Sequence, residues 1–338
     1  FYEEAIKLGI KPIIGYEAYI TPTSRFERPE RDKNKRYHLT LLAENNQGYQ
    51  NLLELVSKAY LEGYYYKPRI DYELLEEYST GLIALSGCLG GEIAQFLAPD
   101  GSNEEGNNEV VRSYEKALLA AKKYQNIFGK ENFFIELHNH GINQQIEILP
   151  DLVKISQEID APLVATNDSH YVEQLDSSAH DALLCVQTNA TLDDENRFKF
   201  EGSGYYVKSS EEMRLLFPEE LYLNACDNTL KIAERIEYNF DFNQTFLPDF
   251  PVSEDQNVEE FLKRKVFNGA KDKYKNLTKE IENRIDYELD VINSMGYASY
   301  FLIVGDLIEF AKSNKIRTGA GRGSAAGSIV SYCLGITG

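Results

Sequence analysis

The chain has 338 residues, of which 43% are hydrophobic and 26% charged, values that suit one large globular domain or two smaller ones. Its formal net charge of −19 disfavours contact with nucleic acid, except through a local basic surface or bound metal ions. There is no membrane-length apolar run, no signal-peptide pattern and no C-x-x-C pair among the four cysteines, so we expect a cytoplasmic protein without membrane contact or a disulfide framework.

Short β-rich runs alternate with helical patterns along the first part of the chain. We predict strands at residues 11–20, 37–43, 81–87, 132–138, 162–168 and 204–210, and helices at residues 47–62, 108–128, 143–159 and 176–187. Residues 100–109 are polar and predict a surface loop. The alternation predicts an α/β domain, either a barrel or a doubly wound sheet.

The later part of the chain is predicted to be mostly helical. Ser209 and Glu212 form a capping-box pattern, and Thr278 is placed to cap a helix that Gly296 ends. Residues 239–257 contain two prolines and no periodic pattern, so we place a domain boundary near Leu247. Helices are predicted at residues 258–274, 278–295 and 300–313, followed by a short strand, "IRT", and a glycine-rich loop.

Residues of metal-ligating types fall in or just after the predicted strands. Asp168 and His170 follow a strand in "VATNDSHY", and Glu17, His38 and Cys88 lie in or after other strands. Each alone is more often a packing residue. Together, carboxylate, imidazole and thiolate suit zinc, manganese or iron, and a cluster of such ions serves phosphate-ester hydrolysis.

Three further histidines carry a weaker signal. His138 and His140 form an H-x-H pattern whose side chains share one face of a strand, so both could reach one metal. His180 lies within a predicted helix near Asp168, where a packing or surface role is the plainer interpretation.

The loop "TGAGRGSAAGSIVSYCL", residues 318–334, matches neither the dinucleotide fingerprint nor the Walker spacing. From residue 310 to 338 the chain is basic, with Lys312, Lys315, Arg317 and Arg322 and no acidic residue. Free backbone N–H groups, the Ser324 hydroxyl and the two arginines favour a polyanion. On charge alone, a solvated helix end explains the stretch equally well.

Several segments together resemble the alpha subunits of bacterial DNA polymerase III. They are "HLTLLAENNQGYQNLLELVSKAY", "LSGCLGGEI", "VATNDSHY", "YYVKSSEEM" and "MGYASYFLIVGDLIEFAK", the last leading into "GAGRGSAAGSIVSYCLGIT". The resemblance implies a polymerase and histidinol phosphatase (PHP) domain at residues 1–246, with a distorted β/α barrel. It also implies that residues 247–338 begin a nucleotidyltransferase palm of the polymerase-beta type.

The resemblance also implies site residues. Those that match the PHP metal ligands are Glu17, His38, Cys88, Asp168 and His170, for Zn²⁺, Mn²⁺ or Fe. Arg322, Gly323 and Ser324 match the motif that receives the nucleotide triphosphate, with Mg²⁺ as the polymerase cofactor. His138 falls where the family commonly has glutamine, which implies a structural or peripheral role for the H-x-H pair.

The chain starts at Phe1 rather than Met, and we interpret it as part of a longer protein. The family's first H-x-H motif, with a further Asp and His, is expected before Phe1. The palm aspartates are expected after Gly338, so no polymerase catalytic residue is expected within these 338 residues.

The activity implied for the whole protein is template-directed DNA synthesis from deoxynucleoside triphosphates on primer–template DNA. The implied partners are a sliding clamp and the proofreading and clamp-loader subunits of the replicase. For the PHP domain, a metal-dependent phosphoesterase or 3′–5′ exonuclease is implied. The alternatives are a free-standing PHP phosphoesterase for a small phosphate ester and a non-catalytic scaffold for a proofreading subunit.

Overall fold

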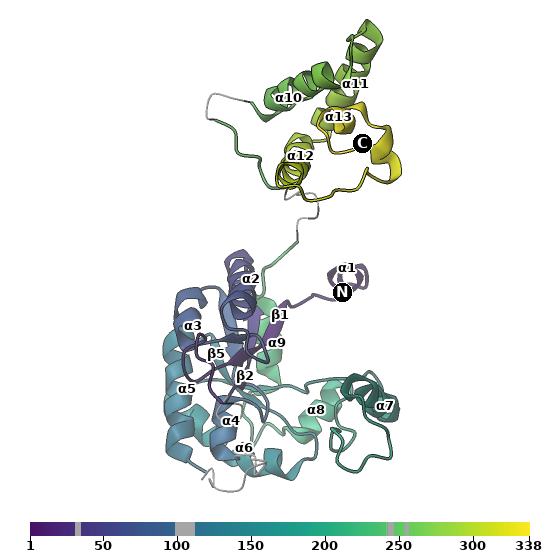
Figure 1. Ribbon diagram of the computed structural model, residues 1–338. Helices are drawn as coiled ribbons and strands as arrows, with labels where there is room; N and C mark the ends of the chain where they lie inside the picture. Colours follow the sequence, from purple (N-terminus) through teal and green to yellow (C-terminus); the bar gives the residue numbers. More distant parts are fainter. Residues whose placement is uncertain (31–34, 99–111, 241, 243–246, 254–256) are drawn as a thin grey trace. The chain divides into compact units, whose positions relative to one another are not determined.

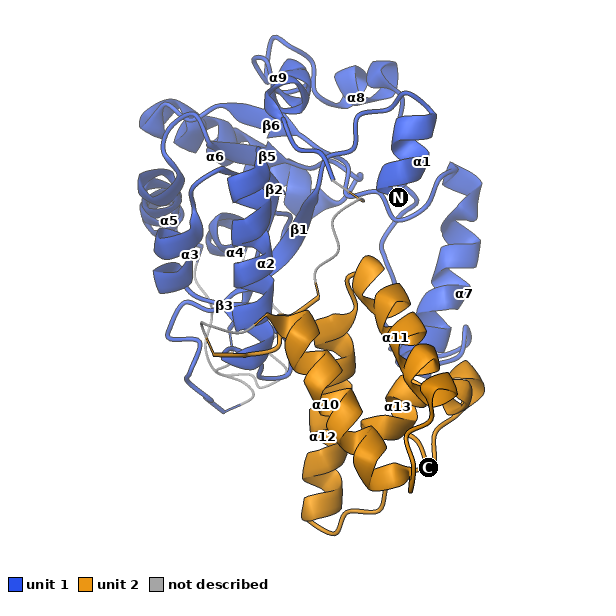
Figure 2. Ribbon diagram, turned by 90° about the horizontal axis from the view of Figure 1, so that it is seen from above, with its two compact units in different colours: residues 1–240 blue, residues 241–338 orange. Residues whose placement is uncertain are grey.

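The computed structural model describes residues 1–30, 35–98, 112–240, 242, 247–253 and 257–338 (Figure 1). The chain forms two compact units, Phe1–Phe240 and Asp241–Gly338, which Figure 2 distinguishes by colour. The polar loop expected at residues 100–109 lies outside the described residues. Each unit has its own buried apolar cluster.

A six-stranded mixed sheet forms the centre of the first unit, in the order β3-β1-β2-β4-β5-β6. Strand β2 is antiparallel to both β1 and β4, whereas β4, β5 and β6 run parallel to one another. The strands are β1 (Gly15–Ile20), β2 (Tyr37–Ala43), β3 (Arg69–Ile70), β4 (Leu82–Leu85), β5 (Phe133–Leu137) and β6 (Leu163–Ala165). The sheet and its flanking helices confirm the predicted α/β class.

Helices bury both faces of this sheet. In β4, Leu82 and Ala84 belong to the main core with α2 to α6, while Ile83 and Leu85 belong to a smaller cluster on the opposite face that includes Ile232 from α9. Burial on both faces explains why β4, β5 and β6 are almost continuously apolar. The helices are α1 (Tyr2–Lys7), α2 (Asn46–Leu61), α3 (Tyr72–Tyr78), α4 (Glu92–Leu97), α5 (Tyr114–Phe128), α6 (Asn143–Ile159), α7 (Ser177–Thr188), α8 (Ser210–Leu216) and α9 (Asp227–Arg235), with a 3-10 turn, η2 (Gln174–Asp176).

The second unit is helical. Its core lies between α10 (Val258–Lys273), α11 (Lys279–Ser294), α12 (Ala298–Ser313) and α13 (Ile329–Cys333), with a 3-10 turn, η3 (Gly323–Gly327), before α13. Thr278 caps α11 by accepting a hydrogen bond from the Ile281 N–H, as predicted. None of the described helices is by itself long and apolar enough to span a membrane, and α11 with α12 would qualify only as a pair bent by 114°.

Two predicted strands are wrong. Residues 204–210 make a single bridge between Tyr206 and Tyr171, because this segment pairs with a loop rather than with a strand of the sheet. The "IRT" segment, residues 316–318, has no strand partner among the described residues. The other predicted strands and helices are found within a few residues of the expected limits, and the Ser209–Glu212 capping box is confirmed. The helix expected at residues 108–128 is α5, which begins at Tyr114, and residues 108–111 of that prediction lie outside the described residues.

Candidate functional site

Neighbouring strands of the sheet bring Glu17 and His38 together. Glu17 in β1 faces Thr40 in β2, so His38, two residues before Thr40, lies diagonally opposite on the same face. The Nδ1 atom of His38 is 2.8 Å from Oε1 of Glu17. The sheet therefore places an imidazole and a carboxylate within reach of one ion.

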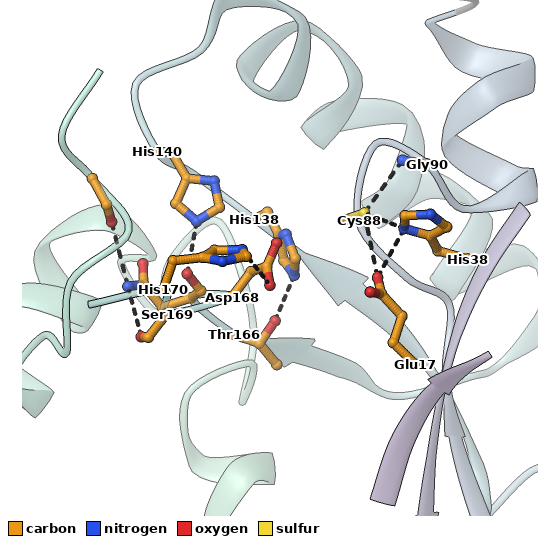
Figure 3. A network of polar contacts seen from close by, with 12 residues as sticks. Glu17, His38, Cys88, Gly90, His138, His140, Thr166, Asp168, Ser169 and His170 are labelled. Carbon is orange, nitrogen blue, oxygen red and sulfur yellow. Dashed lines mark hydrogen bonds and ion pairs between the residues drawn. The ribbon is translucent and has the colours of Figure 1, made fainter. Parts of the chain in front are cut away.

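Cys88 joins them from the loop that follows β4. Its Sγ atom lies 3.4 Å from Nδ1 of His38 and 3.8 Å from Oε1 of Glu17 (Figure 3). In the part of the chain that the structure describes, this is the one group of three such side chains whose ligand atoms all lie within 4.8 Å of one another. One nitrogen, one oxygen and one sulfur donor suit zinc, so the residues present fit a divalent metal.

Glycine in the Cys88 loop permits this close approach. A Cβ atom on Gly90 would lie 3.0 Å from Nδ1 of His38, so a larger residue would press on the imidazole. The backbone N–H of Gly90 donates to Sγ of Cys88 at 3.3 Å, and the His38 N–H donates to the Gly90 carbonyl at 2.9 Å. The loop therefore fixes the thiol against the imidazole.

The electrostatics of this group depend on the three side chains together. Burial disfavours a charged His38, but hydrogen bonds with Cys88 and Glu17 outweigh it and raise the pKa of His38 to about 10. The hydrogen bond from His38 lowers the pKa of Glu17 below its usual value. A metal ion would take the place of the proton that the imidazole and the carboxylate share.

Asp168 and His170 form a second, separate pair in the loop after β6. Oδ1 of Asp168 is 3.4 Å from Nε2 of His170, and Asp168 has a left-handed φ of 43°. The His170 N–H donates to the Tyr205 carbonyl at 2.8 Å, which ties this loop to residues 204–210. In Figure 3 the pair lies on the other side of His138 from the Glu17, His38 and Cys88 group.

Sequence reasoning missed a buried polar network beside both groups. Glu136 in β5 accepts hydrogen bonds from the Thr166 hydroxyl at 2.6 Å and from the Gly87 N–H at 2.9 Å, and it pairs with His138 at 3.2 Å. These bonds outweigh burial and lower the pKa of Glu136. The sequence did contain one signal for this network, which is the carboxylate of Glu136 inside the apolar run "NFFIEL". An unpaired buried charge is costly, so a carboxylate in a buried strand indicates polar partners nearby.

His180 lies in α7 with its ring centroid 5.5 Å from that of His170 and 5.1 Å from that of Phe200. Its pKa is lowered, first by burial and then by the charge of His170. Its aromatic contacts agree with the packing role expected from the sequence.

The glycine-rich loop of the second unit is exposed. Arg322 precedes η3, and Gly323 and Ser324 begin it, while Gly321 and Gly323 have left-handed φ values of 101° and 60°. The loop is anchored to the following segment, because the Gly338 N–H donates to the Ala320 carbonyl at 2.9 Å. Among the described residues, no hydrogen bond or ion pair engages the side chains of Arg317 and Arg322.

Two protein families match parts of this chain. Residues 1–140 match the family described as "PHP domain", and residues 260–338 match the family described as "Bacterial DNA polymerase III alpha NTPase domain". The first match includes β1, β2 and β4 with Glu17, His38 and Cys88, and the second includes the glycine-rich loop.

Curated relatives match over the whole length of the chain. The chain is 47% identical to DNA polymerase III subunit alpha of Borreliella burgdorferi, 44% to that of Treponema pallidum and 42% to that of Mycobacterium tuberculosis. The alignments cover 100%, 97% and 100% of this chain but 28%, 27% and 29% of those proteins. The chain therefore spans less than a third of the length of these relatives.

Proposed function

The chain belongs to the family of bacterial DNA polymerase III alpha subunits, and from this we propose that it is part of a replicative DNA-directed DNA polymerase. The observation that carries the proposal is the identity of 47% to a DNA polymerase III subunit alpha across the entire chain. The substrates are deoxynucleoside triphosphates and primer–template DNA, with Mg²⁺ as cofactor. The partners are a sliding clamp, a proofreading subunit and a clamp loader, in the cytoplasm.

In this proposal, residues 247–338 begin the palm, and Arg322, Gly323 and Ser324 receive the triphosphate of the incoming nucleotide. Three features support that role. The loop is exposed, its arginine is not engaged by another described side chain, and its glycines allow backbone N–H groups to approach an anion closely. The charge of Arg322 binds phosphate oxygens, while the Ser324 hydroxyl and the loop N–H groups orient them.

A chimera tests the polymerase proposal. The chain replaces the matching segment of the Borreliella burgdorferi relative, and primer extension is measured. We expect the chimera to extend a primer, and we expect Arg322→Ala and Ser324→Ala to raise KM for the nucleotide about tenfold, the effect of roughly 1.4 kcal/mol of lost binding. Lys279→Ala, on the exposed start of α11, is the control. A chimera that folds but does not extend a primer contradicts the proposal.

Residues 1–246 are proposed as the PHP domain, a distorted β/α barrel with a metal-dependent phosphoesterase site. Glu17, His38, Cys88, Asp168 and His170 are the proposed ligands for Zn²⁺ or Mn²⁺, with Fe as a further candidate. When bound, such ions supply positive charge that stabilises the transition state of phosphoester hydrolysis. The protein's own part is to hold the two ligand groups at fixed positions on strand ends and loops of one sheet.

The substrate proposed for this site is the 3′ end of a DNA strand, cleaved by 3′–5′ exonuclease action. Asp168→Asn should abolish release of nucleotides from a 3′-labelled oligonucleotide in Mn²⁺ or Zn²⁺ and should lower metal content, while the free energy of unfolding changes little. If the site serves only as a scaffold for a proofreading subunit, the unsubstituted protein should itself show no nuclease activity. The match of residues 260–338 to a polymerase family disfavours a free-standing phosphoesterase for a small phosphate ester.

A further inference from the structure

His138 follows strand β5 and lies between the two groups of proposed ligands in Figure 3. Its side chain is only 7% exposed. His138 and Cys88 also line the same small cavity, of about 10 Å³, close to the smallest volume that holds a water molecule. His138 is therefore near both halves of the site.

The hydrogen bonds of His138 fix which nitrogen carries a proton. Nε2 lies 2.6 Å from the Thr166 hydroxyl and 3.2 Å from Oε1 of Glu136, and the Thr166 hydroxyl is 2.6 Å from the same oxygen. An ionised carboxylate can only accept hydrogen bonds, so the Thr166 hydroxyl uses its one O–H to donate to Glu136. Nε2 must then be the donor toward Thr166 and Glu136.

The other nitrogen, Nδ1, is buried and has no hydrogen-bond partner among the described residues. The neighbouring His140 is different, because its Nε2 lies 2.8 Å from the Asn167 carbonyl and its Nδ1 lies 2.8 Å from Nε2 of Gln145. Both nitrogens of His140 are thus engaged by the protein, whereas one nitrogen of His138 is left without a partner at a position where an orphaned polar atom is costly.

We propose that Nδ1 of His138 is a further ligand of the divalent metal centre, with Thr166 and Glu136 as its positioning residues. A metal-bound histidine characteristically donates its other N–H to a carboxylate, a backbone carbonyl or water, and here Nε2 lies against the Glu136 carboxylate and the Thr166 hydroxyl. The inference rests on the proposed metal centre and adds one ligand to it. It also assigns different roles to the two members of the H-x-H pair, because both ring nitrogens of His140 are already hydrogen-bonded and neither is free to bind a metal.

Two substitutions of His138 by amide side chains test whether this residue is a metal ligand or has only a structural role. The amide of glutamine reaches the position of Nε2, so His138→Gln keeps the contact with Thr166 and loses the ligand. The amide of asparagine reaches the position of Nδ1, so His138→Asn keeps an oxygen for the metal and loses the contact. We expect His138→Gln to weaken Zn²⁺ binding at least tenfold, measured by competition with a chromophoric chelator, and His138→Asn to weaken it less. Full affinity in His138→Gln would overturn the inference.

Histidine NMR supplies a readout that does not depend on activity. The chain contains five histidines, so their ¹⁵N ring signals can be followed individually during a Zn²⁺ titration. We expect the Nδ1 signals of His38 and His138 to move and those of His140 to stay. If His38 responds and His138 does not, the inference is wrong and the metal centre stands. If neither responds, both the metal centre and the inference are wrong.

Discussion

His38 and Glu17 lie on different strands, yet Nδ1 of His38 is 2.8 Å from Oε1 of Glu17. The contact follows from the register of β1 against β2, which sets the two residues diagonally opposite on one face. Strand β2 also pairs with β4, whose following loop carries Cys88. A single strand between two others therefore gathers a carboxylate, an imidazole and a thiol from distant parts of the sequence.

Replacing Cys88 by serine should weaken Zn²⁺ binding at least tenfold. Zinc prefers a thiolate, and a serine hydroxyl does not ionise near neutral pH. Competition with a chromophoric chelator measures the affinity. The control is Cys226→Ser, a half-buried cysteine just before α9. Equal affinities of the two variants would show that Cys88 is not a ligand.

Asp71 should contribute far more stability than Glu73, although both contact Arg25. The Asp71 side chain is 6% exposed, lies 3.0 Å from the Arg25 guanidinium and caps α3, while the Glu73 side chain is 75% exposed. We expect Asp71→Ala to lower the free energy of unfolding by about 3 kcal/mol, because it leaves a buried arginine under-paired and a helix uncapped. Glu73→Ala should cost less than about 1 kcal/mol. Urea denaturation measures both, and similar losses would contradict the assignment.

Two glycines inside helices of the second unit should respond oppositely to alanine. A Cβ atom on Gly269 in α10 would lie 2.0 Å from the Cys333 carbonyl, whereas one on Gly305 in α12 would meet its nearest atom at 3.9 Å. Gly269→Ala should therefore lower the free energy of unfolding by about 2 kcal/mol or more. Gly305→Ala should raise it by up to about 1 kcal/mol through helix propensity. Thermal unfolding of both variants checks the pair, and a stable Gly269→Ala would contradict the close packing of α10 on α13.

The sequence predicted most of the long elements because their hydrophobic periods are clear. It missed β3, which has only two residues, and the short helices α1, α3, α4 and α9, where too few positions exist to show a clear period. The strand predicted at residues 204–210 has β-type residues, but its neighbour is the loop around Tyr171. Local propensity gives no information on which partner a segment meets.

The candidate site was predictable in part for a similar reason. Glu17, His38 and Cys88 could be selected because each lies in or just after a strand, and the structure brings these three together. The hydrogen bonds that Thr166 makes with Glu136 and His138 link β5 and the residue after it to the end of β6. They depend on the pairing of these two strands, which the residues alone do not specify.

Glu288 in α11 holds the start of α13, directly after the glycine-rich loop. Oε2 of Glu288 accepts from the Ser328 hydroxyl at 2.8 Å and from the Val330 N–H at 3.2 Å, and Arg284 pairs with Oε1 at 2.8 Å. The side chain is 11% exposed. Burial would raise the pKa of Glu288, but the hydrogen bonds outweigh it and the pKa is lowered from 4.5.

A lowered pKa in the folded state means that the ionised Glu288 contributes stability above pH 4.5, and that this contribution is lost as the pH falls through the folded pKa. Glu288→Gln should therefore lower the free energy of unfolding by about 1 kcal/mol at pH 7, because neutral hydrogen bonds replace charged ones. The difference from the parent should shrink steadily below pH 4.5. Asp290→Asn, on the exposed side of the same helix, should change stability by less than about 0.5 kcal/mol. A difference that is as large at pH 3 as at pH 7 would show that the charge of Glu288 does not hold α13, since protonation would then leave the contact unchanged.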